Sequence, residues 1–297
     1  MTYDLEGKVV LITGAAGGIG SATARELYLQ GASLVLTDTR QETVDELARE
    51  FDARRVLPLA LDVTDAEAAK AVVRQAVERF GRLDVAFANA GIAWAGVPAT
   101  LRICDEAEFR RIVEVDLFGV WHTLRAALPE IVRNRGQVLI TSSIYAFMNG
   151  MANAPYAASK AAVESLARAL RAELSTTGAS ASVLYPGWTD TAIAKVAFGG
   201  NLLVTRMNES GLPAFLRRPI PPAQVAHAVV HGLQRRRPRI VVPARWAPIA
   251  LMRGLLNVLV DWRLPRDERL QRLLLQLEDE AVRSQAQDRG DPPEVRP

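Results

Sequence analysis

The chain has 297 residues and 49% hydrophobic content, which is ample for one large α/β domain or two small ones. Its net charge of +3 is too small to indicate a nucleic-acid partner, and we expect none. Because Cys104 is the only cysteine, no disulfide can form within the chain, and we expect a cytoplasmic location.

The N-terminal residues 1–6 carry acids where a secretory leader would carry a basic stretch. From residue 8 onward, apolar runs alternate with helix-forming segments. We expect strands at 8–13, 32–38, 55–61, 83–88, 136–142, 181–185 and 239–242. We expect helices at 21–30, 43–51, 66–80, 106–134 (broken in the middle), 154–174 and 224–234. This alternation predicts a Rossmann-like α/β domain over residues 1–243, with a doubly wound, seven-stranded parallel sheet and helices on both faces.

Three further segments lie around this domain. Residues 189–220 form a long, loosely patterned insert that we expect to act as a lid over substrate. Residues 244–283 predict a C-terminal helical extension, with one mostly apolar helix at 246–262 and a second at 266–283. Residues 284–297 are polar, and we expect a disordered tail.

A glycine-rich loop joins the first strand to the first helix. Its glycines are Gly14, Gly18 and Gly20, with Ile19 between the last two. Such a loop lets a pyrophosphate approach the backbone, where the N–H groups of the helix N-terminus can bind it. An ordinary turn is the alternative, but the position between strand and helix favours a dinucleotide cradle. The absence of a lysine after Gly20 excludes the phosphate loop of nucleoside triphosphatases.

The second strand ends at Asp38. A carboxylate here can accept hydrogen bonds from the adenosine ribose and repels a 2′-phosphate. We therefore expect NAD as the cofactor rather than NADP, although Arg40 nearby could admit a phosphate.

Tyr156 and Lys160 are four residues apart on an expected helix and therefore share a face. A free phenol has a pKa of about 10 and is a poor base near neutrality, and an adjacent ammonium lowers that pKa. The pair predicts a tyrosine that exchanges a proton with substrate. Taken separately, the two residues could be a half-buried aromatic and a solvated charge.

The glycine loop, followed by Tyr156-Ala157-Ala158-Ser159-Lys160, resembles the short-chain dehydrogenase/reductase family over residues 5–243. The resemblance implies an NAD(P)-dependent alcohol dehydrogenase or ketone reductase that forms a homodimer or homotetramer. It also implies that Ser143, thirteen residues before Tyr156, holds the substrate oxygen and that Lys160 contacts the nicotinamide ribose. Beyond the glycines, Asp38, Tyr156 and Lys160, it implies cofactor contacts at Asp62, Val63, Asn89, Ala90, Gly91, Pro186, Gly187 and Thr191.

Asp116 departs from the family pattern, which has asparagine at this position to support a water linked to the lysine. Aspartate accepts hydrogen bonds but donates none. We expect Asp116 to act as a counter-ion of Lys160 and to change the titration of Tyr156.

Apolar residues occupy the positions where substrate is expected, among them Trp94, Tyr145, Phe147 and Trp188. They predict a hydrophobic secondary alcohol or ketone, such as a steroid, retinoid, terpene or lipid-like compound. The alternative is that these residues only form core.

Parts of the sequence are also compatible with other functions. The 244–283 extension could lie peripherally on an anionic membrane, cover the active-site mouth or pack on a partner subunit. His227 and His231 share a helix face, but no acidic or cysteine partner lies nearby, so we expect no metal. A non-catalytic dinucleotide-binding protein and a membrane-surface interaction protein remain alternatives, while an epimerase of the extended branch lacks its larger substrate domain.

Overall fold

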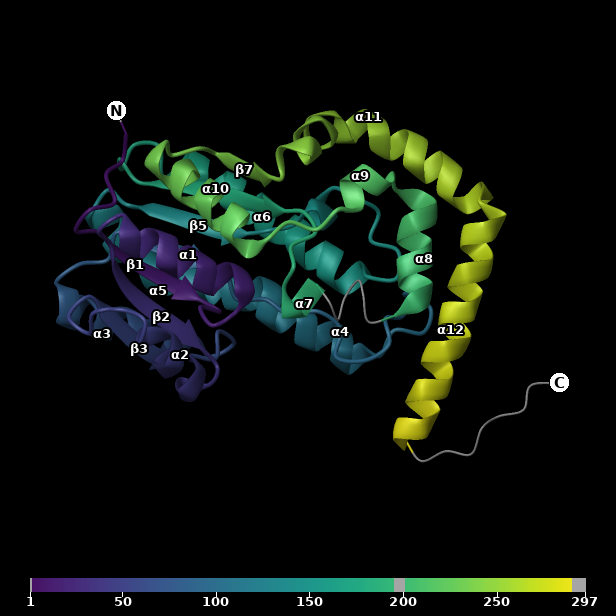
Figure 1. The fold of residues 1–297 in the computed structure, drawn as a ribbon, viewed down its shortest axis with the longest axis horizontal. Coiled ribbons are helices and arrows are strands. Elements are labelled where there is room, and N and C mark those ends of the chain that lie inside the picture. Colours follow the sequence, from purple (N-terminus) through teal and green to yellow (C-terminus); the bar gives the residue numbers. More distant parts are fainter. Residues whose placement is uncertain (1, 195–200, 290–297) are drawn as a thin grey trace.

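A computed structural model describes residues 2–194 and 201–289, with side chains through residue 285. It contains the seven-stranded parallel sheet that the sequence predicts, and the strand order is β3-β2-β1-β4-β5-β6-β7 (Figure 1). The strands are β1 (Val9–Thr13), β2 (Ser33–Asp38), β3 (Val56–Ala60), β4 (Val85–Ala88), β5 (Gln137–Thr141), β6 (Ser180–Pro186) and β7 (Arg239–Val242).

Side chains of each strand alternate between two hydrophobic cores. Val10 and Ile12 of β1 pack on one face of the sheet, whereas Val9 and Leu11 pack on the other. The first face is covered by α1 (Gly18–Leu29), α2 (Gln41–Ala48) and α10 (Pro222–Gln234). The second face is covered by α3 (Ala66–Phe80), α5 (Val120–Arg133) and α6 (Ala154–Glu173). Burial on both faces explains why the strands are continuously apolar.

The helix expected at 106–134 is broken, as predicted, into α4 (Glu106–Val113), a π-helical segment η1 (Glu114–Gly119) and α5. Asp105 caps α4 by accepting hydrogen bonds from the backbone N–H groups of residues 107 and 108. A π-helical turn contains one more residue than an α-helical turn, so its side chains point in directions that a regular α-helix would not give. In η1 it leaves Asp116 fully buried.

The insert at 189–220 forms short helices, namely α7 (Ala192–Ala194), α8 (Leu202–Gly211) and α9 (Ala214–Arg217). Residues 195–200 of the expected lid lie outside the described residues. The extension contains η4 (Ala244–Trp246), α11 (Ala247–Arg263), η5 (Leu264–Arg266) and α12 (Glu268–Arg289). Together α11 and α12 form an arm along one end of the molecule (Figure 1).

The inner side of α12 packs against α8 of the insert. Leu270, Leu273 and Leu277 of α12 contact Val204 and Met207 of α8 in a small separate core. Polar contacts flank this core: the Asn201 amide donates to Glu280 at 2.8 Å, and the Thr100 hydroxyl donates to Glu278 at 2.5 Å. The extension therefore packs against the insert and against the loop that contains Thr100.

The second extension helix is longer than expected. It continues through Arg289, into the segment 284–297 for which we expected disorder, because no helix breaker occurs before Gly290. The Gln285 amide anchors this part by donating to the Ile103 carbonyl at 3.3 Å. Residues 290–297 lie outside the described residues.

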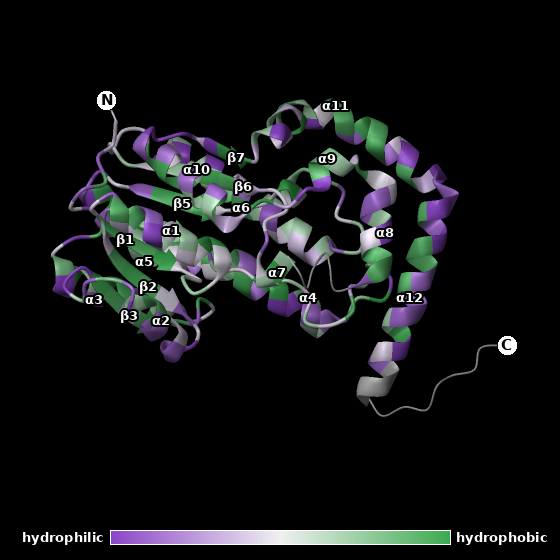
Figure 2. Cartoon of the chain, in the orientation of Figure 1, coloured by the Kyte–Doolittle hydropathy of each residue, from purple (hydrophilic) through white to green (hydrophobic). Residues whose placement is uncertain are grey.

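In Figure 2, α11 is coloured largely as hydrophobic, whereas α12 carries more polar residues. Within the described parts of the chain, no helix combines the length and the apolar character that crossing a bilayer requires.

Candidate active site

The carboxyl ends of the central strands surround a cavity of about 920 Å³. The cavity lies where the strand order reverses between β1 and β4, the position at which doubly wound sheets bind ligands. Its walls come from the glycine loop, the ends of β2, β4, β5 and β6, one face of α6, and the start of the insert. Segments distant in sequence thus meet at one edge of the sheet.

The glycine loop has the close packing expected of a phosphate cradle. Gly14 has φ +63°, and a Cβ there would lie 2.9 Å from the Ala90 Cα. At Gly20 a Cβ would collide with the Gly14 carbonyl oxygen, so Gly20 shapes the turn without lining the cavity. The N-cap of α1, Gly17, has no side chain to occupy the first N–H groups of the helix. This uncapped terminus, facing the cavity with Gly18 and Ile19, fits a pyrophosphate.

Asp38 connects the end of β2 to the glycine loop. Its carboxylate accepts hydrogen bonds from the backbone N–H of Ala16 at 3.2 Å and of Thr39 at 2.8 Å. Asp38, Asp62 and Val63 line the same end of the cavity, where the resemblance implies that the adenosine binds. Arg40 is the N-cap residue of α2 and does not line the cavity.

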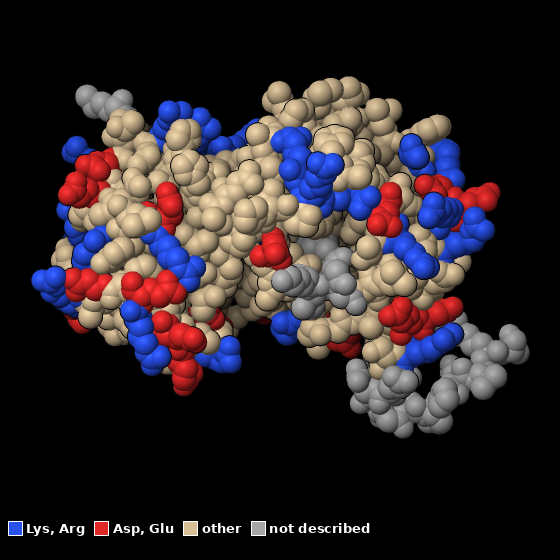
Figure 3. Space-filling model, viewed as in Figure 1, with Lys and Arg blue, Asp and Glu red and all other residues tan. Residues whose placement is uncertain are grey.

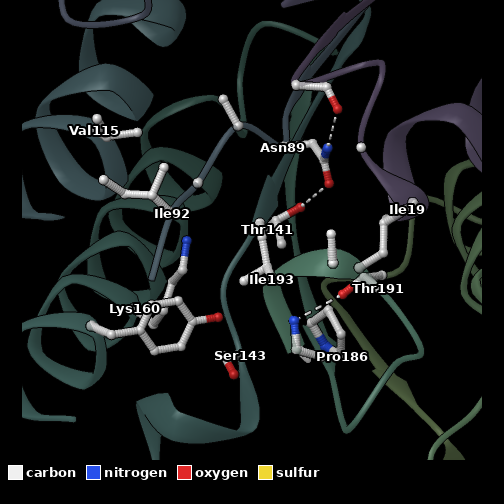
Figure 4. Close-up of a pocket in the computed structure, with 18 of the residues that line it drawn as sticks. Ile19, Asn89, Ile92, Val115, Thr141, Ser143, Lys160, Pro186, Thr191 and Ile193 are labelled. Carbon is white, nitrogen blue, oxygen red and sulfur yellow. Dashed lines mark hydrogen bonds between the residues drawn. The ribbon is translucent and has the colours of Figure 1, made fainter. Parts of the chain in front are cut away.

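Asn89 holds the ends of three strands together (Figure 4). Its amide donates to the carbonyl oxygens of Thr13 at 3.1 Å and Gly14 at 3.2 Å, and its side-chain oxygen accepts from the Thr141 hydroxyl at 3.2 Å. The Thr13 hydroxyl in turn accepts from the N–H groups of Asn89 and Ala90, each at 3.0 Å. Neither Thr13 nor Thr141 was among the predicted cofactor-binding residues. Each is a polar residue at the end of a buried strand, and this position could have indicated that it lies near the cavity.

Tyr156, Lys160 and Ser143 converge on the inner end of the cavity. The Lys160 ammonium lies 5.2 Å from the centroid of the Tyr156 ring, so the two side chains share one face of α6. Ser142 points away, because its hydroxyl donates to the Lys160 carbonyl at 2.7 Å. The Ser143 hydroxyl accepts from the Tyr145 N–H at 3.2 Å, which fixes its position. Among the two serines, the orientation therefore favours Ser143 for contact with substrate.

Asp116 forms an ion pair with Lys160 inside the protein. Its Oδ2 lies 2.9 Å from the Lys160 Nζ, and its Oδ1 accepts from the Ile92 N–H at 2.7 Å. Burial would lower the pKa of Lys160, but the neighbouring carboxylate and phenol outweigh it and raise this pKa. Burial also raises the pKa of Asp116, against the opposing effect of the ammonium. The structure thus places Asp116 where a counter-ion of Lys160 would lie.

The pKa of Tyr156 departs from our expectation. We expected the ammonium to lower it, but in the structure the pKa is raised above its ordinary value. Removal of water from the phenol is the largest cause, and the Asp116 charge adds to it. The Lys160 ammonium and a hydrogen bond with Ser143 act in the opposite direction without prevailing.

Two of the four expected substrate residues, Tyr145 and Trp188, line the cavity. Trp94 does not, because its side chain packs under Ile112 of α4 and Ala281 of α12. Phe147 does not either, because it turns inward, with its ring 5.9 Å from that of Tyr185. Other residues that were not predicted from the sequence also line the cavity. One is Arg111, whose guanidinium donates hydrogen bonds to the Glu108 carboxylate and the Ala93 carbonyl.

The chain belongs to the short chain dehydrogenase family, whose sequence model matches residues 8–200. It is similar to cis-4-hydroxycyclohexanecarboxylate dehydrogenase of Sinomonas cyclohexanicum, with 38% identity over 63% of this chain and 75% of the relative. It is 30% identical to 11-beta-hydroxysteroid dehydrogenase 1A of Arabidopsis thaliana, over 87% of this chain and 75% of that relative. A family member from Burkholderia phymatum, solved in complex with NAD, superimposes with a TM-score of 0.72 at 25% identity, covering 86% of this chain and 96% of the other.

Family, fold and relatives agree on an oxidoreductase that uses a nicotinamide dinucleotide. The glycine cradle fits the pyrophosphate of such a cofactor, because the N-terminus of α1 has no side-chain cap and lines the cavity at Gly17 and Gly18.

Proposed function

We propose that this protein is an NAD-dependent dehydrogenase or reductase acting on a hydrophobic secondary alcohol or ketone. One observation carries the proposal: Ser143, Tyr156 and Lys160 meet at the inner end of a cavity whose other end has the geometry of a dinucleotide cradle. Residues that can move a proton and a site that can hold a hydride carrier therefore share one space.

The cofactor supplies the hydride acceptor or donor, and the protein moves the proton. In oxidation Tyr156 accepts the proton of the substrate hydroxyl, and in reduction it returns that proton to the carbonyl oxygen. The Ser143 hydroxyl donates a hydrogen bond to the same oxygen and holds it beside the phenol. Lys160 stabilises the phenolate that forms, and Asp116 holds the ammonium in place through the 2.9 Å ion pair.

NAD is the favoured cofactor. The carboxylate of Asp38 lines the adenosine end of the cavity, where it can accept hydrogen bonds from ribose hydroxyls and would repel a phosphate. Arg40, the basic residue that could offset this repulsion, does not line the cavity.

The wall near Ser143 supports a hydrophobic substrate. Tyr145, Trp188, Ile92 and Ile193 line this part. The cations there, Arg111 and Lys160, are paired with Glu108 and Asp116. One relative carries a name that fits this class, since it is named for a hydroxysteroid.

The direct test is turnover of a panel of secondary alcohols with NAD and NADP, followed through the absorbance of the reduced nicotinamide. We expect lipophilic cyclic and long-chain alcohols to exceed small polar ones in kcat/KM, and NAD to exceed NADP. Tyr156→Phe should reduce kcat by about 100-fold or more, as expected for loss of an acid–base group. Full turnover by Tyr156→Phe would refute the role of the phenol, and preference for small polar alcohols would refute the substrate class.

A non-catalytic dinucleotide-binding protein is the second candidate, favoured only by the unusual Asp116. The same panel separates the two, because that protein would bind NAD without turning over any alcohol.

A homo-oligomer is the partner that the family resemblance implies. Phe118 and Trp121 support it, because these aromatic side chains lie on one helical face with 43% and 42% of their surface exposed. Sedimentation of the purified chain tests this proposal.

A further inference from the structure

The outward face of α11 is apolar and open to solvent. Leu251, Leu255, Val258 and Trp262 form one line along the helix, with exposed fractions of 80%, 62%, 66% and 63%. Met252 and Leu259 widen this line to a stripe, and they are 49% and 57% exposed. No residue of α11 is buried. We call these six residues the α11 stripe.

The opposite side of α11 fixes the orientation of the stripe. Arg253 forms a two-pronged ion pair with the buried carboxylate of Glu164 on α6, at 2.7 and 2.8 Å. Ile249 and Ala250 pack on the core beside it. Because this inner side is anchored, the stripe cannot turn inward by rotation of the helix.

Basic residues flank the stripe at both ends of α11, whereas the acidic residue of the helix faces the protein. Asp261, the acidic residue of α11, accepts a hydrogen bond from Asn149 on the protein side. Arg245 precedes the helix and donates to the Arg218 carbonyl, while Arg263 and Arg266 are exposed at its far end. In Figure 3 the first part of the edge formed by α11 shows no charged side chain, basic side chains lie near its start, and basic and acidic side chains lie together where α11 meets α12.

We propose that the α11 stripe is a docking surface for an anionic lipid bilayer, in which α11 lies parallel to the membrane plane. An amphipathic helix with an exposed apolar face, a tryptophan and flanking arginines has the chemistry of the bilayer interface. The arginines can reach lipid phosphates while the six apolar side chains enter the acyl boundary. Its 17 residues include Arg253, Asn257 and Asp261, so α11 lacks the roughly 20 apolar residues that a span needs and suits a parallel position.

Charge also argues against a second copy as the occupant. In an antiparallel two-fold contact between two α11 stripes, Arg245 of one copy would approach Arg263 and Arg266 of the other, and Asp267 and Glu268, which lead into α12, would offset only part of this repulsion. Such like-charge contacts oppose association, whereas the phosphate groups of a bilayer attract the same residues.

Vesicle flotation of the full chain tests this inference. We expect the protein to float with vesicles of phosphatidylcholine and phosphatidylserine and to remain unbound with phosphatidylcholine alone. The double variant Leu251→Glu/Leu255→Glu should lose binding, while the matched control Leu29→Glu, at an equally exposed leucine on α1, should retain it. Arg263→Gln and Arg266→Gln should each weaken binding about fivefold, as expected for one basic residue at an anionic surface.

The proposal would be overturned if the parent chain did not float with the anionic vesicles, or if Leu251→Glu/Leu255→Glu floated equally well. It would also be overturned if the parent chain bound no vesicles and the double variant sedimented as a smaller assembly than the parent. The last result would assign the stripe to a second copy of the chain. Turnover with NAD should be unchanged in the double variant, so failure of the docking surface remains distinguishable from failure of the proposed reaction.

Discussion

The Asp116 carboxylate lies 2.9 Å from the Lys160 ammonium, and both side chains are almost completely buried. The Asp116 charge raises the pKa of Tyr156, and the Lys160 charge lowers it. The proton-transfer group therefore titrates under the combined field of an ion pair, and its protonation depends on both members.

Replacing Asp116 by asparagine should shift the pH profile of the reaction. Loss of the negative charge lowers the pKa of Tyr156, because that charge disfavours phenolate. Oxidation requires phenolate, so the acidic limb of its kcat profile should move to lower pH, by about one unit. Reduction requires the protonated phenol, so its alkaline limb should move in the same direction. The control Glu106→Gln, at an exposed acid on α4, should leave both limbs in place, and an unmoved profile for Asp116→Asn would exclude the coupling.

Replacing Asp38 by alanine should change coenzyme preference. Loss of an ionised hydrogen-bond acceptor should lower kcat/KM for NAD roughly tenfold or more, and loss of repulsion should raise the value for NADP. Glu42→Gln, an exposed acid at the start of α2, is the matched control. An unchanged NAD-to-NADP ratio in Asp38→Ala would show that Asp38 only orders the loop through Ala16 and Thr39.

Replacing Arg253 by methionine should destabilise the fold. Glu164 would then keep a buried charge without its two-pronged partner, at a cost of about 3 kcal/mol in the free energy of unfolding. The double variant Arg253→Met/Glu164→Leu should recover much of this loss, because it removes the unpaired charge. Denaturant unfolding measures the free energy of unfolding of the single and the double variant. Arg263→Met, at an exposed arginine, is the control. Equal stability of the single and double variants would contradict the account.

Replacing Leu277 by alanine should loosen the insert over the cavity. The side chain is fully buried between α12 and α8, so the cavity left behind should cost about 3 kcal/mol. Because α12 supports α8, KM for substrate should rise more than kcat falls. Leu275→Ala, on the exposed side of the same helix, should change stability by less than about 0.5 kcal/mol. A normal KM in a measurably destabilised Leu277→Ala would separate the extension from the active site.

Local sequence patterns were sufficient to predict the sheet, its strand positions and the glycine loop. These features depend on local patterns: continuous apolar runs mark strands buried on both faces, and a close glycine cluster between strand and helix marks a cradle. These patterns also placed Tyr156 and Lys160 together, because four residues along a helix return to the same face.

Contacts between segments that are distant in the sequence could not be predicted from local patterns. Trp94 and Phe147 are aromatic residues in the expected substrate loops, yet packing with α12 and β6 turns them away from the cavity. The support of α8 by α12 joins residues about 70 positions apart, which no local pattern records. The raised pKa of Tyr156 has the same origin, because burial and the Asp116 charge arise only when η1 packs against α6.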